Sequence, residues 1–205
     1  CHVTTTTISD EQHAHTAQRI KEEGLEDRIT LLKQDYRELT GRYDRLISVE
    51  MIEAVGHQYL DTYLNKLDSL LTDDGQAMLQ AITIRDQRFE EAKRDMDFIK
   101  RYIFPGGFLP SHHAMLSSVM RKTSLNVVAL DEIGQHYART LREWRHRFEA
   151  SLEQVRELGY DERFIRMWRY YLCYCEGGFI ERSIGTCHLL LAKPAAKPIP
   201  LTGAL

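Results

Sequence analysis

The sequence predicts an α/β protein organised around a parallel β-sheet. Over the first half of the chain, short apolar runs rich in β-branched residues alternate with amphipathic stretches of helical length, a pattern typical of βαβ units. With 205 residues, 43% of them hydrophobic, the chain is long enough to bury the core of one globular domain. We expect this domain over residues 1–192 and a disordered tail over residues 193–205, where prolines and small residues replace the periodic pattern.

The elements of the first half follow from apolar periodicity and from capping residues. Strands are expected over residues 3–8, 28–33, 43–49 and 77–84. Ser9 is placed to cap a helix over residues 10–24, because a serine side chain accepts hydrogen bonds from the unpaired N–H groups of a first helical turn. A second helix is expected over residues 59–71, and the Thr-Asp-Asp-Gly run at residues 72–75 is expected to form the turn before the fourth strand.

The second half is richer in helix. One highly charged helix is expected over residues 85–102, and an apolar, turn-rich loop follows at residues 104–111, where Ser111 is placed to cap the next helix. A strand over residues 125–130, helices over residues 137–158 and 161–179, and a last strand over residues 187–191 complete the assignment.

Composition excludes several classes of function. The 27 basic and 30 acidic residues give a net charge of −3, so nothing favours nucleic acid as a partner. No apolar run is long enough for a transmembrane segment, and the first residues do not read as a secretory leader. The four cysteines are too few and too irregularly spaced for a disulfide framework, so we expect reduced thiols in a cytosolic protein. His57, His112 and His113 lack metal-ligand spacing with a third partner, so no metal site is expected.

The candidate site is defined by the residues that follow the predicted strands, because ligands of an open α/β sheet bind beyond the carboxyl ends of its parallel strands. These residues are Thr7, Ile8, Ser9 and Gln12; Gln34, Asp35 and Tyr36; Glu50 and Glu53; and Gln80, Ile82 and Thr83. No glycine-rich turn follows a strand, so neither a dinucleotide site nor hydride transfer is indicated. The polar groups place a site at one edge of the sheet but do not by themselves name a reaction.

Several segments, in order along the chain, resemble the family of cyclopropane-fatty-acyl-phospholipid synthases and mycolic acid methyltransferases. The segments are residues 3–12 (VTTTTISDEQ), 34–37 (QDYR), 44–56 (DRLISVEMIEAVG), 102–111 (YIFPGGFLPS), 136–144 (HYARTLREW) and the aromatic helix at 163–174. The resemblance covers about residues 1–192. Because several independent motifs occur in the same order, it is more specific than any one of them.

This resemblance implies a Rossmann-like class I methyltransferase sheet with helices on both faces. In that fold the first, central strand and the glycine-rich loop after it bind part of S-adenosylmethionine, and the present chain begins without methionine at the strand that corresponds to the second. We therefore expect an N-terminally truncated fragment that lacks the central strand and the loop. Such a fragment is expected to be unstable and inactive alone, because two inner strand edges would have no partner.

The resemblance also implies the reaction. A methyl group passes from S-adenosylmethionine to a cis double bond in a phospholipid acyl chain, bicarbonate accepts a proton, and a cyclopropane ring closes. Glu53, Tyr137 and Gln80 would be catalytic, and with the backbone amide of Ile82 they would bind the bicarbonate. The cofactor would be bound by Thr7, Ile8, Ser9, Gln12, Gln34, Asp35 and Tyr36. The acyl chain would lie against Tyr102, Phe104, Gly106, Gly107 and Phe108.

The implied partners are phospholipid acyl chains at the membrane surface, and the implied location is the cytoplasm, peripheral to the inner face of the membrane. A homodimer of the full-length enzyme is left open. Arg163, Arg166 and Arg169 alternate with aromatic residues along one predicted helix. This stripe either contacts lipid phosphates or is the charged face of a core helix, and we favour the second interpretation.

Each site residue also has a purely structural interpretation. Glu53 could be a carboxylate at a helix start, Tyr137 could pack at a helix start, and Asp35 could cap a turn. The loop at residues 104–110 could be an ordinary surface turn. Glu50 is expected to have only a local role, because the family motif matches at Glu53.

One residue departs from the family pattern. Many members have a histidine where this chain has Gln80, and a glutamine can donate a hydrogen bond to bicarbonate but cannot take up a proton. Either the anion binds in an altered form, or the enzyme stops at a methylated product. Two other functions stay open: a methyltransferase of the same fold that acts on another lipid or an amine, and an inactive fragment that associates with another protein.

Overall fold

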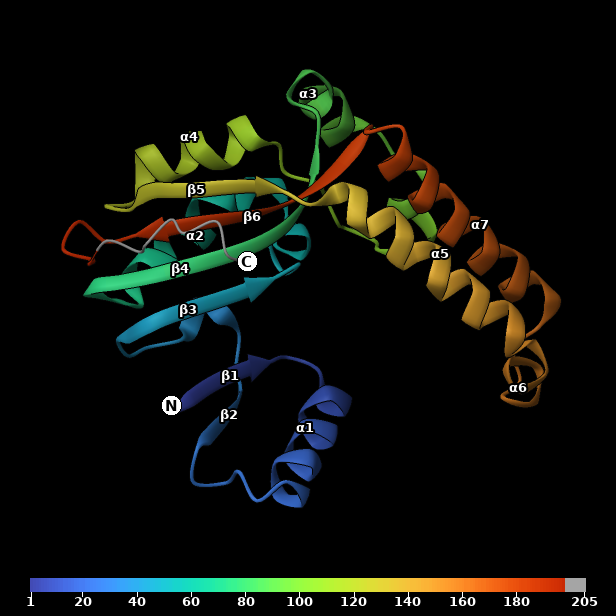
Figure 1. Cartoon of the computed structure of the whole chain (residues 1–205), viewed down its shortest axis with the longest axis horizontal. Helices are drawn as coiled ribbons and strands as arrows, with labels where there is room; N and C mark the ends of the chain where they lie inside the picture. Colours follow the sequence, from blue (N-terminus) through green and yellow to red (C-terminus); the bar gives the residue numbers. More distant parts are fainter. Residues whose placement is uncertain (198–205) are drawn as a thin grey trace. The chain divides into compact units, whose positions relative to one another are not determined.

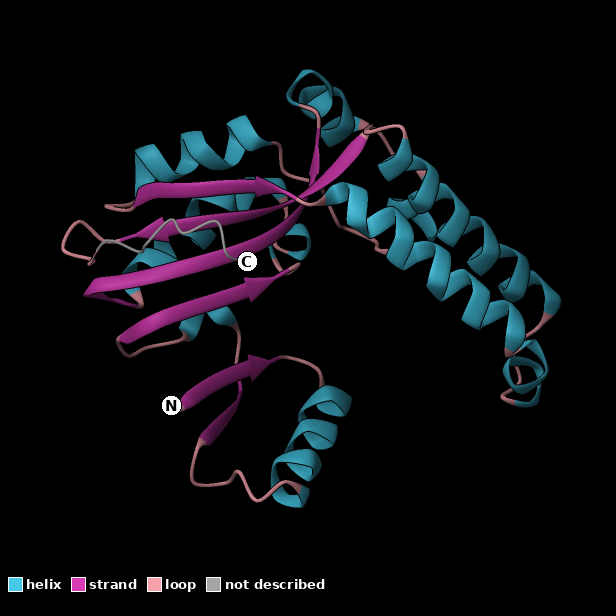
Figure 2. Cartoon of the chain, in the orientation of Figure 1, coloured by secondary structure: helices cyan, strands magenta, loops and turns pink. Residues whose placement is uncertain are grey.

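A computed structural model describes residues 1–197, which divide into two compact units. The first unit is Cys1–Arg42 and the second begins at Tyr43. Figure 1 shows the elements of both units, and Figure 2 shows how helices and strands alternate along the chain. Each unit is described by itself below.

The first unit is a two-stranded parallel sheet with one helix. β1 (Val3–Thr7) and β2 (Ile29–Lys33) pair in parallel, and α1 (Asp10–Glu22) connects them. The side chain of Ser9 accepts a hydrogen bond from the N–H of Gln12, so the predicted cap is confirmed. The helix ends at Glu22, and Gly24, with a φ of 63°, begins the turn towards β2.

The second unit contains a four-stranded sheet in the order β3-β4-β6-β5. The strands are β3 (Tyr43–Val49), β4 (Leu71–Ile84), β5 (Asn126–Glu132) and β6 (Ile184–Ala192). β3 and β4 are parallel, as predicted, but β6 is antiparallel to both β4 and β5. A purely parallel sheet is therefore the wrong expectation for the last strand.

The direction of β6 follows from the helices before it. α5 (Gly134–Ala150) leads away from the end of β5, the short α6 (Leu152–Glu157) reverses the chain, and α7 (Glu162–Ile180) returns along α5 (Figure 1). The chain thus re-enters the sheet at the end where β5 leaves it, so the next strand must run in the opposite direction. The predicted single helix over residues 137–158 is wrong, because it is interrupted at Ser151.

The charged helix predicted over residues 85–102 is also interrupted. α3 (Asp86–Arg94) ends before a new π-helical turn at Ile99–Ile103. The carboxylate of Asp97 accepts a hydrogen bond from the N–H of Lys100 at 2.9 Å. Asp97 therefore caps a new helical start inside the charged stretch, which the charge pattern alone did not reveal.

The predicted turn at residues 72–75 lies inside β4. Tyr43 pairs with Leu71, whereas Arg45 pairs with Gln76, so the intervening residues of β4 form an irregular bulge opposite one residue of β3. An Asp-Asp-Gly run is typical of turns, and here the same residues interrupt the register without ending the strand.

The core of the second unit lies on one face of its sheet. α2 (Leu60–Ser69) and α4 (His112–Lys122) pack together, and Ser118 donates a hydrogen bond to Asp61 at 2.6 Å. Side chains alternate along β4, so Ala77 and Leu79 are buried. On the neighbouring strand, Ile47 is 71% exposed. On the same face as Ile47, Ile82 of β4 is partly buried and packs against the apolar cluster of α5 and α7.

The chain after β6 is held at its start. The backbone N–H of Lys193 donates to the carbonyl of Gly75 at 2.9 Å, and its ammonium group lies 2.8 Å from the carboxylate of Asp68. The rest of the predicted tail, residues 198–205, lies outside the described residues. Among the described residues, none of the helices is long and apolar enough to cross a membrane.

Candidate active site at the carboxyl end of β3

Two glutamates follow β3 and reach towards β4. Glu50 directly follows the strand, and Glu53 lies in the short 3-10 turn Ile52–Ala54. Together with Gln80 on β4 and Tyr137 on α5, they form what we call the carboxylate cluster. Glu50, Glu53 and Gln80 lie where β3 ends, as expected for a ligand site of this kind of sheet, and Tyr137 reaches them from α5.

Glu50 is held in an unusual backbone conformation. Its φ is 52°, in the left-handed region that side chains rarely adopt. Its N–H donates to the carbonyl of Gln80 at 2.8 Å, which continues the ladder of β3. The left-handed turn then directs the side chain of Glu50 back over β4.

The carboxylate of Glu50 accepts hydrogen bonds from two other members of the cluster. Its Oε1 accepts from Nε2 of Gln80 at 2.9 Å and from the hydroxyl of Tyr137 at 2.7 Å. On its other side, Oε1 of Gln80 lies 2.9 Å from Nε2 of His188 on β6. Because an amide oxygen only accepts, the ring of His188 donates from Nε2, and this bond directs the amide N–H of Gln80 at Glu50.

The side chain of Glu53 supplies the next hydrogen-bond acceptor for β4 at the point where β3 ends. In a regular parallel pair, the residue that donates to the carbonyl of Gln80 would also accept from the N–H of Ile82. Here that N–H donates instead to Oε1 of Glu53 at 2.5 Å. The second oxygen, Oε2, is buried and has no hydrogen-bond partner among the described residues.

The environment of Glu53 favours its neutral form. Burial raises the pKa of this carboxyl group to about 7, and the negative charge of Glu50 acts in the same direction. Hydrogen bonds from the N–H groups of Glu53 itself and of Ile82 oppose the rise without cancelling it. At neutral pH the carboxyl group of Glu53 is therefore able both to hold and to release a proton.

The ring of Tyr137 is part of an aromatic surface beside the carboxylate cluster. Its ring stacks on Phe179 at a centroid distance of 4.9 Å and meets Trp144 edge to face at 6.3 Å. Burial raises the pKa of Tyr137, and its hydrogen bond to Glu50 raises it further. Burial also raises the pKa of Tyr171 to about 12, so both phenols stay neutral donors near Glu50.

The structure brings Glu53, Gln80, the N–H of Ile82 and Tyr137 into one region. Tyr137 contacts Glu50 rather than Glu53. Glu50, which was expected to have only a local role, is the carboxylate to which Gln80 and Tyr137 donate. His188 is a further residue of this region that the sequence did not indicate. Its strand was predicted, but the pairing of that strand with β4, which sets His188 opposite Gln80, was not.

The predicted acyl-chain loop is tied to Glu53. The N–H of Phe108 donates to the carbonyl of Glu53 at 3.0 Å, and the Phe108 ring is buried against His57. Gly107 has little room for a side chain, because an added Cβ would lie 3.0 Å from the carbonyl oxygen of Phe104. The loop thus passes close to the backbone of the cluster.

The remaining aromatic residues of the loop are more open. Tyr102 and Phe104 are 51% and 55% exposed. Phe104 lies 6.2 Å from the ring of Tyr171, and Tyr102 lies 5.6 Å from that of Phe98. Gly106 has a φ of 82°, which the turn between these aromatic residues and Phe108 requires.

The predicted cofactor residues lie in the first unit, where β1 and β2 end. Thr7 and Lys33 are register partners in the parallel pair, so the residues after both strands emerge at one edge. The hydroxyl of Thr7 donates to Oε1 of Gln12 at 2.7 Å, and it accepts from the N–H of Ser9 at 3.1 Å. The side chain of Ile8 between them is 74% exposed.

At the end of β2, Asp35 holds the following turn through hydrogen bonds with Arg37. Its carboxylate accepts hydrogen bonds from the side chain and the backbone of Arg37, and these lower the pKa of Asp35 to about 2. Tyr36 begins the 3-10 turn that Asp35 caps. The carbonyl of Gln34 accepts from the hydroxyl of Thr6 at 2.6 Å, so both strand ends are linked. The structural interpretation of Asp35 as a cap is confirmed, and its carboxylate is anionic.

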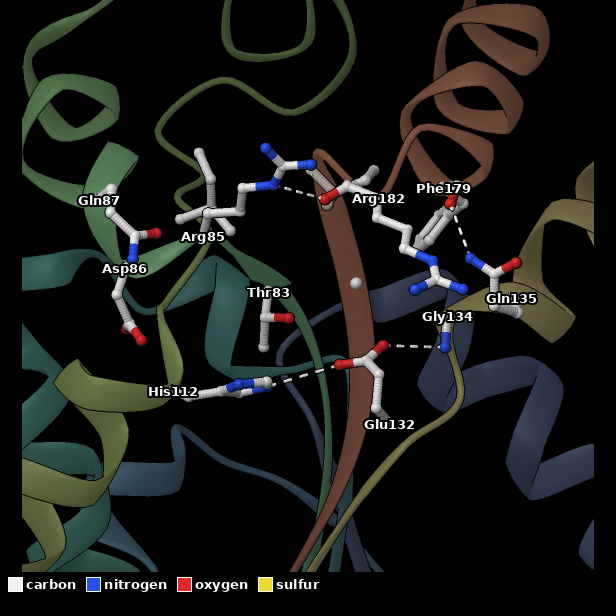
Figure 3. Close-up of a pocket in the computed structure, with 13 residues that line it drawn as sticks. Thr83, Arg85, Asp86, Gln87, His112, Glu132, Gly134, Gln135, Phe179 and Arg182 are labelled. Carbon is white, nitrogen blue, oxygen red and sulfur yellow. Dashed lines mark hydrogen bonds and ion pairs between the residues drawn. The ribbon is translucent and has the colours of Figure 1, made fainter.

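A pocket of about 500 Å³ opens beside the ends of β4 and β6 (Figure 3). Its floor is organised by Glu132, whose Oε1 accepts from the N–H groups of Gly134 at 3.0 Å and Thr186 at 2.9 Å. The other oxygen lies 3.6 Å from Nε2 of His112. Phe179 lines this pocket and also stacks on Tyr137, so the pocket and the carboxylate cluster share the wall formed by α5 and α7.

A substitution at Gly134 tests how tightly this floor is packed. An added Cβ would lie 2.7 Å from the carboxylate of Glu132 and 3.0 Å from backbone atoms of β6. Gly134→Ala is therefore expected to lower the free energy of unfolding by about 1–3 kcal/mol. Gly177→Ala is the matched control: nothing lies within 4 Å of its added Cβ, and it sits inside α7. It is expected to raise stability by about 0.5–1 kcal/mol.

Urea unfolding of both variants measures the difference. Equal midpoints for Gly134→Ala and the original protein would show that the start of α5 relaxes around a methyl group.

The described residues contain no group of histidine, cysteine, aspartate and glutamate side chains that could bind a metal ion.

The sheet and the position of its site define a mixed α/β fold of the class I methyltransferase type. The crystal structure of mycolic acid cyclopropane synthase CmaA1 with SAH and CTAB matches with a TM-score of 0.84, at 25% identity, over 94% of this chain and 70% of that chain. The structure of the cyclopropane synthase MmaA2 from Mycobacterium tuberculosis has the same TM-score at 22% identity and shares the fold. The predicted fold class is confirmed.

The chain belongs to the mycolic acid cyclopropane synthetase family, whose model matches residues 1–189. It is 40% identical over 178 residues to the tuberculostearic acid methyltransferase UfaA1 of Mycobacterium tuberculosis, covering 87% of this chain and 42% of that protein. It is 36% identical over 192 residues to the cyclopropane-fatty-acyl-phospholipid synthase of Escherichia coli K12, covering 91% and 46%. The chain thus spans less than half the length of these relatives. The family comprises S-adenosylmethionine-dependent lipid methyltransferases, including cyclopropane synthases.

Proposed function

We propose that this protein transfers the methyl group of S-adenosylmethionine to the cis double bond of a phospholipid acyl chain, after which the methylated chain loses a proton and closes a cyclopropane ring. The observation that carries the proposal is the carboxylate cluster beside the aromatic wall of Tyr137 and Phe179. Attack of a double bond on a methyl donor leaves positive charge on the lipid. Fixed carboxylates in a partly apolar site stabilise such a charge and can accept a proton.

The residues after β1 and β2 suit the adenosine part of the cofactor. S-adenosylmethionine, when bound, supplies a methyl group on a sulfonium sulfur. The exposed side chain of Ile8 offers an apolar surface for a flat base, and the anionic Asp35 offers lone pairs to hydroxyl groups. The amide of Gln12 can donate beside them. We assign cofactor binding to these residues together with Thr7, Ser9, Gln34 and Tyr36.

The acyl chain is assigned to the loop that is bound to Glu53. Phe108 links this loop to the backbone of the cluster, and Phe104 contacts Tyr171 on α7. Tyr102, Gly106 and Gly107 complete the assigned surface. The buried ring of Phe108 helps to exclude water, which a carbocation on the lipid would otherwise capture.

The bicarbonate implied by the family resemblance does not fit the donors found here. The hydroxyl of Tyr137 and the amide of Gln80 both donate to Glu50, and the N–H of Ile82 donates to Glu53. All three predicted donors are therefore bound by carboxylates of the chain itself. A further anion would add negative charge next to the carboxyl groups of Glu50 and Glu53, which like-charge repulsion disfavours.

We propose that the enzyme meets its substrate at the cytoplasmic surface of the membrane. Of the three arginines in the stripe on α7, Arg169 pairs with Glu149 through two contacts of 2.6 Å and is held by the protein. Arg163 and Arg166 are exposed and could contact lipid phosphates.

Incubation of the full-length natural protein with methyl-labelled S-adenosylmethionine and vesicles of unsaturated phospholipid tests the function. Label is expected in the acyl chains, and vesicles of saturated phospholipid, which have no double bond to attack, are the matched control. Label in a small amine but not in unsaturated lipid would contradict the proposal.

A second candidate product is a methylated chain that keeps a double bond. It is favoured by the similarity to a tuberculostearic acid methyltransferase. Proton loss to a C=C bond and ring closure give products of the same mass. Proton NMR separates them, because only the ring has strongly shielded methylene protons and only the alkene has vinylic ones.

A further inference from the structure

The side chain of Glu50 occupies the place where a small anion was expected. Two of the three donors predicted for that anion, the Tyr137 hydroxyl and the Gln80 amide, converge on a single oxygen of Glu50. Their distances of 2.7 and 2.9 Å are those of charge-assisted hydrogen bonds. The donors are thus already used by a carboxylate that belongs to the chain.

The backbone conformation of Glu50 places its carboxylate beside these two donors. A φ of 52° at a residue other than glycine costs free energy, and such conformations persist where the surrounding contacts maintain them. At Glu50 those contacts are the two hydrogen bonds to the side chain and the backbone bond to the carbonyl of Gln80. His188 orients Gln80 from the far side, so the amide is directed at Glu50 before any ligand arrives.

We propose that the Glu50 carboxylate is the built-in anion and proton acceptor of this site, so that the reaction needs no bicarbonate. The inference rests on the proposed function for its reaction and on the geometry of Glu50 for its site. In the step it serves, a C–H bond of the methylated, cationic acyl chain breaks. The electron pair of that bond forms the new carbon–carbon bond, and the proton goes to Glu50, which becomes a carboxylic acid and later releases the proton to water.

Glu53 supports this role rather than competing for it. One of its oxygens is bound to the N–H of Ile82, so it is part of the strand ladder. Burial and the charge of Glu50 raise the pKa of Glu53 to about 7. A proton on Glu53 lowers the total negative charge of the pair, so Glu53 does not add a second full charge beside Glu50.

Two substitutions at Glu50 separate the proposal from a structural role. Glu50→Gly suits the left-handed backbone and removes the side chain, which frees the hydroxyl of Tyr137 and the amide of Gln80 for an added anion. Glu50→Gln keeps the size of the side chain, removes its charge and leaves no such space. Both are made in the full-length natural protein, and circular dichroism with a thermal melt verifies that each is folded.

The readout is lipid methylation in buffer freed of carbon dioxide, with and without added sodium bicarbonate. The original protein is expected to have the same turnover in both. Glu50→Gln is expected to lose about 10²-fold in both, the usual contribution of a positioned base. Glu50→Gly is expected to lose a similar factor without bicarbonate and to recover at least part of it when bicarbonate is added. Turnover of the original protein that stops without bicarbonate and returns with it would overturn the proposal, as would a Glu50→Gln variant of unchanged turnover.

Binding of carbon-13-labelled bicarbonate, followed by NMR line broadening, gives a readout without turnover. Broadening is expected with Glu50→Gly and not with the original protein, and the reverse would overturn the proposal. If no lipid is labelled under any condition, the proposed function fails. The binding result still decides whether Glu50 fills the anion site.

Discussion

Tyr137→Phe is expected to lower the turnover of lipid methylation by about 10²-fold, while the KM for the lipid changes little. The substitution removes only the hydroxyl that donates to Glu50 at 2.7 Å. The ring can keep its stacking on Phe179, so the loss of stability should be about 1 kcal/mol, the usual net value of one hydrogen bond. Steady-state kinetics with vesicles and labelled cofactor measure the first effect, and urea unfolding measures the second.

Tyr160→Phe is the matched control for this experiment. Tyr160 is 48% exposed and stacks on Phe164 at 4.2 Å, so it also loses a hydroxyl and keeps an aromatic contact. Its turnover is expected to be unchanged. If Tyr137→Phe and Tyr160→Phe had equal turnover, the hydroxyl of Tyr137 would have no part in the reaction.

The parts of the candidate site that follow from strand positions could be predicted from the sequence. Gln80 and Ile82 are two residues apart near the end of an apolar strand, and Glu53 follows the neighbouring strand within a family motif. The carboxyl ends of parallel strands meet at one edge, so these residues had to lie close together. The pairing of Glu53 with the N–H of Ile82 confirms that step.

The role of Glu50 could not be predicted in the same way. Whether its side chain points away from the sheet or back over it depends on one backbone angle. A positive φ is signalled in sequence by glycine or asparagine, not by glutamate. The contact with Tyr137 then joins residues 87 positions apart in the chain, which no local pattern specifies.

The same limit applies to the fold. Periodicity predicted where the strands lie, because each has its apolar alternation in a short window. It did not predict that β6 runs against its neighbours, since this depends on the antiparallel packing of α5 and α7 across a long stretch of chain. The break in the charged helix likewise could not be predicted, because it depends on the carboxylate of Asp97 accepting a hydrogen bond from the backbone N–H of Lys100.

Glu53→Gln is expected to flatten the dependence of stability on pH between about 4.5 and 7. In the folded protein burial raises the pKa of Glu53 to about 7 from its ordinary value of 4.5. Between these values the folded state binds more protons at this group than the unfolded state, so the free energy of unfolding falls as the pH rises. The fall from pH 5 to pH 8 should be about 2–3 kcal/mol at most, because one pKa unit corresponds to about 1.4 kcal/mol.

A glutamine at this position keeps an oxygen that can accept from the N–H of Ile82 at the site where Glu53 does so at 2.5 Å, but it has no charge to bury. The variant should therefore gain stability relative to the original protein as the pH rises from 5 to 8. Glu153→Gln, at an exposed position on α6, is the control and should leave the slope unchanged. Parallel pH profiles for Glu53→Gln and the original protein would mean that Glu53 ionises as an ordinary carboxyl group. In that case the carboxyl group of Glu53 would be charged at neutral pH, and it could not reduce the negative charge beside Glu50 when the lipid reacts.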